Sequence, residues 1–185
     1  MKDKIIFLDF DGVVNCPIWR DYVEDGETVF KCKYAWPADG FVNNFQAICW
    51  LNELYKKYPF DIVVSSSWRM DCKDYTPAEC LYNGGLNKEI EIIDMLPAGY
   101  QREELIAEWL KRKDYKGEYI IFDDEDSYYY CTMIPEAEEF RKKLVLTDEE
   151  IGITYKDFLK AEGIFRHWEN QKMIDCGMAF APYNK

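Results

Sequence analysis

Two aspartates follow a short apolar run near the start of this sequence. Residues 5–8 (IIFL) predict a buried strand of a parallel sheet. Asp9 and Asp11 come directly after it, two residues apart, so in an extended chain their side chains point the same way. Because neighbouring carboxylates repel each other, this spacing indicates that a positive charge belongs beside them.

Two further predicted strands also end in polar side chains. Residues 61–64 (DIVV) are followed by three serines, and residues 118–122 (EYIIF) are followed by four acidic residues that begin with Asp123 and Asp124. In an open α/β sheet, ligands bind outside the carboxyl ends of the strands. Carboxylate and hydroxyl oxygens without histidine or cysteine suit Mg²⁺, so the sequence predicts a magnesium site at this edge.

The elements that must position these side chains alternate along the chain. Apolar residues recur at helical spacing in residues 47–58 and 102–112, and residues 142–148 (KKLVLTD) predict a fourth strand. Residues 153–163 predict a last helix that begins at a capping box and ends at Gly163. This alternation is typical of an α/β, Rossmann-like three-layer sandwich with a mainly parallel sheet.

Composition limits the classes of function. The 185 residues, 48% of them hydrophobic, predict one globular domain, with no apolar run long enough to cross a membrane and no secretion signal. Seven cysteines without a C-x-x-C pair favour reduced thiols and a cytoplasmic location, and the single histidine excludes any site that needs two. The net charge of −12 argues against tight, non-specific nucleic-acid binding.

Three motifs in these positions resemble the haloacid dehalogenase (HAD) superfamily of aspartate-nucleophile phosphotransferases. FLDFDGVV is similar to the first motif, VVSSS to the second and IIFDD to the acidic fourth. Within the superfamily, the segments SSSWR, REELIAEWL, FDDEDS and LVLTDEEIGIT resemble the HAD-type domains of RNA-repair ("Swiss Army Knife") proteins. The resemblance covers roughly residues 4–160 and implies a Mg²⁺-dependent phosphatase with only small cap inserts.

The resemblance also implies roles for the acidic residues. Asp9 would attack phosphorus and form an aspartyl-phosphate, and Asp11 would act as general acid and then general base. Asp9, the backbone carbonyl of Asp11 and an acid of the third strand would hold the metal. Alignment favours Asp124 as that ligand, with Asp123 in support, and both stay in the predicted metal site.

The phosphate-binding residues are less narrowly defined. A serine at the end of the second strand would donate to a phosphate oxygen. We favour Ser66 over Ser65, because the related pattern places its serine or threonine two residues before Trp68, and Ser67 is a further candidate. The basic third motif is either Arg102, which opens the helix before the third strand, or Arg69. Each arginine could equally be a solvated surface residue.

The substrate is the least specified part of the prediction. Residues 1–165 form the expected catalytic domain, in which inserts 14–40 and 70–100 would be a small cap or lid, and residues 166–185 form an expected packed tail. The inserts mix aromatic and basic residues, which favours a nucleotide or a nucleic-acid terminal phosphate, although they could equally be a hydrophobic lid. A small-metabolite phosphatase and a non-catalytic binding module that retains the fold are the alternatives.

Overall fold

The computed structural model describes residues 1–24, 27–33, 40–68, 74–97, 101–127 and 134–176, with the backbone alone described at 18–24 and 27–33. In this part of the chain, five parallel strands form one sheet in the order β5-β4-β1-β6-β7. The strands are β1 (Lys4–Leu8), β4 (Asp61–Val64), β5 (Ile92–Met95), β6 (Glu118–Asp123) and β7 (Leu144–Leu146). The fold is therefore the α/β, Rossmann-like class that the sequence predicts.

The centre of this sheet carries the topological switch point. From β1 the chain adds β4 and β5 on one side and then returns to add β6 and β7 on the other. Leu8 at the end of β1 lies in register with Val64 of β4 and with Phe122 of β6. The carboxyl ends of β1 and β6 are thus adjacent at the point where an open α/β sheet provides a crevice for ligands.

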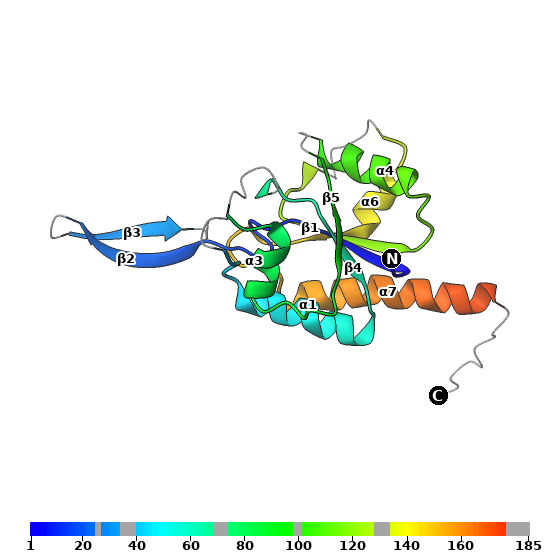
Figure 1. The fold of residues 1–185 in the computed structure, drawn as a ribbon, viewed down its shortest axis with the longest axis horizontal. Coiled ribbons are helices and arrows are strands. Elements are labelled where there is room, and N and C mark those ends of the chain that lie inside the picture. The colour runs from blue at the N-terminus through cyan, green and yellow to red at the C-terminus, as the bar shows by residue number, and fades with distance from the viewer. Residues whose placement is uncertain (25–26, 34–39, 69–73, 98–100, 128–133, 177–185) are drawn as a thin grey trace.

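Helices cover both faces of the sheet, as Figure 1 shows. Ile6 and Leu8 belong to the apolar cluster beneath α1 (Phe45–Lys57) and α7 (Tyr155–Asp175), and the alternate residues Ile5 and Phe7 belong to the cluster beneath α4 (Arg102–Arg112) and α6 (Ala137–Lys143). Burial on both faces explains why these strands are continuous apolar runs. No helix in the described ranges is long and apolar enough to cross a membrane.

An antiparallel hairpin occupies the first predicted insert. Its strands are β2 (Ile18–Glu24) and β3 (Glu27–Lys33), and Figure 1 shows it projecting away from the sheet. Its root is fastened to the domain: the side chain of Asn43 accepts from the Cys16 backbone N–H at 2.9 Å and donates to the Cys16 carbonyl at 2.6 Å. The hairpin therefore rises from the edge of the sheet that carries Asp9.

The second predicted insert contains regular structure that the sequence pattern did not reveal. It holds α3 (Pro77–Asn83), which begins at a capping box made by Thr76 and Glu79, and β5, which pairs with β4 at the margin of the main sheet. Strand β5 contains only two consecutive isoleucines, and its residues are half-buried or exposed. The sequence therefore lacks the long apolar run that would predict a buried strand here. Part of residues 70–100 thus belongs to the sheet.

The predicted end of the last helix is wrong. Thr154 and Asp157 do form the expected capping box, but α7 continues through Gly163 to Asp175. A glycine inside a helix costs only about 1 kcal/mol, and burial of Phe158, Ala161 and Phe165 on the same helix outweighs that cost. The helix crosses the expected boundary between domain and tail, and tail residues 177–185 lie outside the described part of the chain.

Candidate active site

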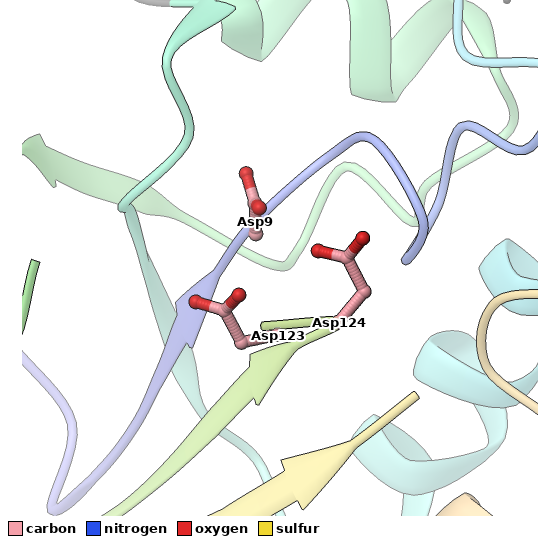
Figure 2. A group of neighbouring side chains, drawn as sticks. All are labelled: Asp9, Asp123 and Asp124. Carbon is pink, nitrogen blue, oxygen red and sulfur yellow. The ribbon is translucent and has the colours of Figure 1, made fainter. Parts of the chain in front are cut away.

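Three aspartates from two neighbouring strands converge at the switch point. Asp9 follows β1, Asp123 is the last residue of β6, and Asp124 comes next, as Figure 2 shows. One carboxylate oxygen from each lies within 4.8 Å of the others. Asp9 and Asp123 are buried and Asp124 is half-buried. The backbone N–H of Asp9 donates to the Phe122 carbonyl at 3.1 Å, so pairing of β1 with β6 fixes the two strand ends together.

Arg102 brings a positive charge to the same place. It is the first residue of α4, and its Nη1 donates to Asp9 Oδ2 at 2.9 Å and also to Asp123 Oδ2. The remaining oxygens are held by the backbone, because Phe10 N–H donates to Asp9 Oδ1 at 2.8 Å and Glu125 N–H donates to Asp123 Oδ1 at 3.0 Å. The guanidinium and backbone donors thus fix the carboxylates in place.

Electrostatics in this cluster oppose full ionisation of its acids. Burial raises the pKa of Asp123 above its usual range, even though Arg102 acts to lower it. Burial, followed by the nearby charge of Asp9, raises the pKa of Asp124 to about 6. Carboxylates shifted in this way by burial and by like charge are stabilised in their ionised form by an additional cation.

The carboxylate of Asp11 lies outside this three-aspartate group. Its Oδ1 accepts a hydrogen bond from Asn15 Nδ2, and its Oδ2 accepts one from Trp68 Nε1 at 3.0 Å. Burial raises the pKa of Asp11 against the effect of these two bonds. The predicted two-residue spacing therefore gives the two aspartates different surroundings: Asp9 faces Arg102, and Asp11 faces an amide and an indole.

Gly12 allows the chain to turn closely over Asp124. Its φ of +70° is a conformation that favours glycine, and a Cβ at this position would collide with the Asp124 carboxylate. Thr147, just after β7, holds the same turn: its Oγ1 donates to the Gly12 carbonyl at 2.8 Å, and its N–H donates to the Asp123 carbonyl at 2.9 Å. The sequence pattern did not single out Thr147, which lies within the predicted strand 142–148 and just beyond the end of the observed β7.

The serines after β4 end at the same edge. Ser65 and Ser66 are buried and Ser67 is exposed, and the Ser65 N–H donates to the Leu8 carbonyl at 2.9 Å. Ser66 Oγ accepts from the Trp68 backbone N–H at 3.3 Å. The choice of Ser66 as the phosphate-binding serine stays a prediction. The other predicted cation, Arg69, lies outside the described residues.

The donor set of the three-aspartate group fits a hard divalent cation. Its described members offer only carboxylate oxygens, which Mg²⁺ prefers, and their burial beside one another leaves negative charge that such an ion would offset. Three carboxylates exceed the single charge of Arg102. This cluster is therefore able to hold a divalent metal.

An open parallel sheet with an aspartate after its first strand and paired acids after the adjacent strand is the arrangement expected of a HAD-type domain. The family described as "HAD domain in Swiss Army Knife RNA repair proteins" matches residues 5–158, and the chain belongs to it. Comparison with curated proteins and with solved structures gave no match. The family assignment points to a phosphatase-type hydrolase.

Proposed function

We propose that this protein is a Mg²⁺-dependent phosphomonoester hydrolase that works through an aspartyl-phosphate on Asp9. The observation that carries the proposal is the convergence of Asp9, Asp123 and Asp124 beside Arg102, in a chain that belongs to the HAD family. A phosphate ester is anionic, so a carboxylate nucleophile can approach it only where charge is neutralised. The site combines a nucleophile with the groups that would provide this neutralisation.

The proposed reaction uses the two aspartates of the first motif in turn. An Asp9 carboxylate oxygen attacks phosphorus, the bond from phosphorus to the leaving oxygen breaks, and Asp11 gives its proton to that oxygen. Asp11 then takes a proton from water, whose oxygen attacks the aspartyl-phosphate and releases inorganic phosphate and free Asp9. Arg102 stabilises negative charge on the transferring phosphoryl group.

The metal would be held by Asp9, Asp124 and the backbone carbonyl of Asp11, with Asp123 supporting it. When bound, Mg²⁺ offsets the negative charge of the phosphate and the surrounding carboxylates. Ser66, with Ser67 as a further candidate, would donate to a phosphate oxygen. These roles follow the family pattern, and the convergence of the Asp9, Asp123 and Asp124 carboxylates supports the metal-binding role of these three residues.

For the substrate we propose a nucleotide or the terminal phosphate of a nucleic acid. The family is described as a HAD domain in RNA repair proteins, and this description supports the choice. The net charge of −12 disfavours extensive contact with a polyanion and is compatible with a substrate that is short or engaged only at its end. The same charge favours, as a second candidate, a small phosphorylated metabolite.

The test is a hydrolysis assay on p-nitrophenyl phosphate, nucleotides, a sugar phosphate and oligonucleotides that carry a 3′- or 5′-phosphate. We expect activity with Mg²⁺, none with EDTA, and none for Asp9→Asn, because an amide cannot serve as the nucleophile. Asp94→Asn, which changes a carboxylate bonded to Trp109 on α4, should retain activity and is the control. Full activity in metal-stripped protein, or near-normal turnover by Asp9→Asn, would contradict the proposal.

A further inference from the structure

Trp68 connects two parts of the candidate site that are far apart in the sequence. Its indole Nε1 donates to Asp11 Oδ2 at 3.0 Å, and its backbone N–H donates to Ser66 Oγ at 3.3 Å. Its side chain is buried, and its ring packs edge-on against Phe10, with the ring centroids 5.1 Å apart. One residue therefore contacts the first-motif loop and the serine turn after β4.

The second oxygen of Asp11 is held from within its own loop. Residues 13, 14 and 15 donate their backbone N–H groups to the Phe10 carbonyl, at 3.1, 2.9 and 2.8 Å. This tight turn brings the buried Asn15 side chain back onto Asp11 Oδ1. The Asp11 carboxyl group thus has one donor on each oxygen, one from its own loop and one from Trp68.

Two fixed donors determine how a carboxyl group is rotated. An indole N–H can only donate, so Asp11 Oδ2 must present a lone pair to Trp68 whether or not the carboxyl group carries a proton. Among the residues that the structure describes, loss of the indole donor would leave the Asn15 bond alone on this carboxyl group, which could then turn about that bond. A general acid must lie within hydrogen-bond reach of the leaving oxygen, and small displacements of a catalytic group are costly.

We propose that Trp68 is a positioning residue, whose indole N–H fixes the Asp11 carboxyl group relative to a phosphate ester bound at the Ser66 turn. This inference rests on the proposed function, in which Asp11 protonates the leaving oxygen. It assigns Trp68 no contact with the substrate. Asn15 holds the other carboxyl oxygen in the same arrangement.

The chain contains a matched control for this interaction. Trp109 of α4 is also buried, donates its indole Nε1 to Asp94 Oδ2 at 2.9 Å, and packs edge-on against Phe7, with centroids 5.5 Å apart. It lies in the other apolar cluster, across the sheet from Phe10. Trp68→Phe and Trp109→Phe each remove one indole N–H from a carboxylate and keep an aromatic ring.

The experiment measures kcat/KM for a series of aryl and alkyl phosphates with leaving groups of increasing pKa. This parameter reports the steps up to departure of the leaving group, the stage at which Asp11 acts as an acid. General acid catalysis contributes about 10²–10⁴-fold and matters most for poor leaving groups. We expect Trp68→Phe to lower kcat/KM by roughly 10-fold or more for an alkyl phosphate and by less than about 3-fold for p-nitrophenyl phosphate. Both losses are smaller than the full contribution of the general acid, because Asp11 itself is still present.

Trp109→Phe should leave unchanged the ratio of kcat/KM for the alkyl phosphate to kcat/KM for p-nitrophenyl phosphate. Because this ratio is measured within one preparation, it does not depend on the fraction of the variant that is folded. In the Asp11→Asn background, Trp68→Phe should add no further selectivity against poor leaving groups, since the acid that it positions is gone.

Three results would overturn the inference. A Trp68→Phe ratio equal to that of wild type would mean that the indole does not position the acid, while the phosphatase assignment would stand. An added selectivity of Trp68→Phe in the Asp11→Asn background would show that the two residues act independently. Failure of the wild-type protein to hydrolyse any member of the series with Mg²⁺ would remove the proposed function, and this inference with it.

Discussion

Arg102 Nη1 lies 2.9 Å from Asp9 Oδ2, although 93 residues separate the two in the sequence. The guanidinium also contacts Asp123, and it sits at the N-terminus of α4, whose helix dipole adds positive character at that end. One cation therefore faces the proposed nucleophile and an acid of the adjacent strand. Of the two arginines that the sequence offered for the third motif, Arg102 has this contact, and Arg69 lies outside the described residues.

Replacement of Arg102 by methionine should lower kcat by about 10²–10³-fold, the usual cost of removing one group that stabilises charge in the transition state. Arg102→Lys should recover part of this loss, because it restores the charge without the planar guanidinium. The measurement is steady-state hydrolysis of p-nitrophenyl phosphate with saturating Mg²⁺.

Arg112→Met is the control, since Arg112 lies at the exposed end of the same helix. It should change kcat by less than about 2-fold, in line with the small effects of most surface substitutions. Equal losses for the two methionine variants would indicate that Arg102 acts through the stability of α4 and not on the phosphoryl group.

Gly12→Ala should impair the acidic cluster itself. The new Cβ would meet the Asp124 carboxylate, and the φ of +70° is strained for alanine. We expect weaker binding of Mg²⁺, measured by isothermal titration calorimetry, and a loss of activity that added Mg²⁺ reverses only in part. An alanine variant with wild-type Mg²⁺ affinity would show that the close approach of this turn to Asp124 has no role.

Gly163→Ala is the comparison for Gly12→Ala, because it adds the same methyl group at a position where the group has room. Gly163 lies within α7, and a Cβ there meets no atom within 4 Å. The substitution should stabilise the protein by about 0.5–1 kcal/mol, the difference in helix propensity between glycine and alanine, without an effect on Mg²⁺ binding. Thermal or urea unfolding measures this gain.

The sequence predicted the parts of the site that depend on local pattern. Asp9 and Asp123 each follow a continuous apolar run, and parallel strands bring such ends to one edge whatever the details of packing. Helix α4 lies where the apolar pattern of residues 102–112 predicted a helix, because its apolar face repeats regularly. The apolar runs and the helical repeat are local patterns, so each lies within a few residues of the site residue or helix that it predicts.

The missed features depend on tertiary contacts. Trp68 and Thr147 contact Asp11 and Gly12 across 57 and 135 residues, and no periodicity marks such pairs. The sequence predicts residues 14–40 as a small cap or lid and does not reveal the β2–β3 hairpin that lies within them. The helix end at Gly163 was placed by a local stop signal, but packing against the sheet overrides that signal.

Cys16 provides a test of how firmly the hairpin root is held. Burial raises the pKa of its thiol to about 11, against the effect of the hydrogen bond from Asn44. The pKa is raised, so the thiol stays protonated below about pH 11, and at pH 8 only about one molecule in 10³ carries the reactive thiolate. Alkylation of Cys16 by iodoacetamide should therefore be slow at pH 8 and accelerate roughly tenfold per pH unit.

Exposed Cys176, at the end of α7, is the internal reference. Peptide mass spectrometry of a labelling time course distinguishes the two sites. Cys16 should react far more slowly than Cys176 in the native protein and at a similar rate in guanidinium chloride. Equal native rates would mean that the hairpin root opens readily, despite the contacts of Asn43 and Asn44.

The number of nucleotides that the site engages can be measured from the dependence of kcat/KM on the length of the nucleic acid. If only one or two terminal nucleotides are bound, kcat/KM for 3′- or 5′-phosphorylated oligonucleotides should change little once the chain exceeds about two nucleotides, since stacking of about 1–3 kcal/mol per base comes only from those positions. The plot of log kcat/KM against log salt should have a slope no steeper than about −1.5, as expected for one or two phosphate contacts. A net charge of −12 should repel the further phosphates of a longer chain.

Trp19 and Trp36 of the first insert are the residues we expect to stack on the terminal base, although their side chains lie outside the described part of the structure. Trp19→Ala or Trp36→Ala should raise KM for oligonucleotides and leave KM for p-nitrophenyl phosphate unchanged, because the aryl ester carries no base. A steep dependence on chain length and salt would instead indicate an extended nucleic-acid track. Equal kcat/KM for sugar phosphates and nucleotides, unaffected by either substitution, would favour the small-metabolite phosphatase and leave the roles of Asp9 and Asp11 intact.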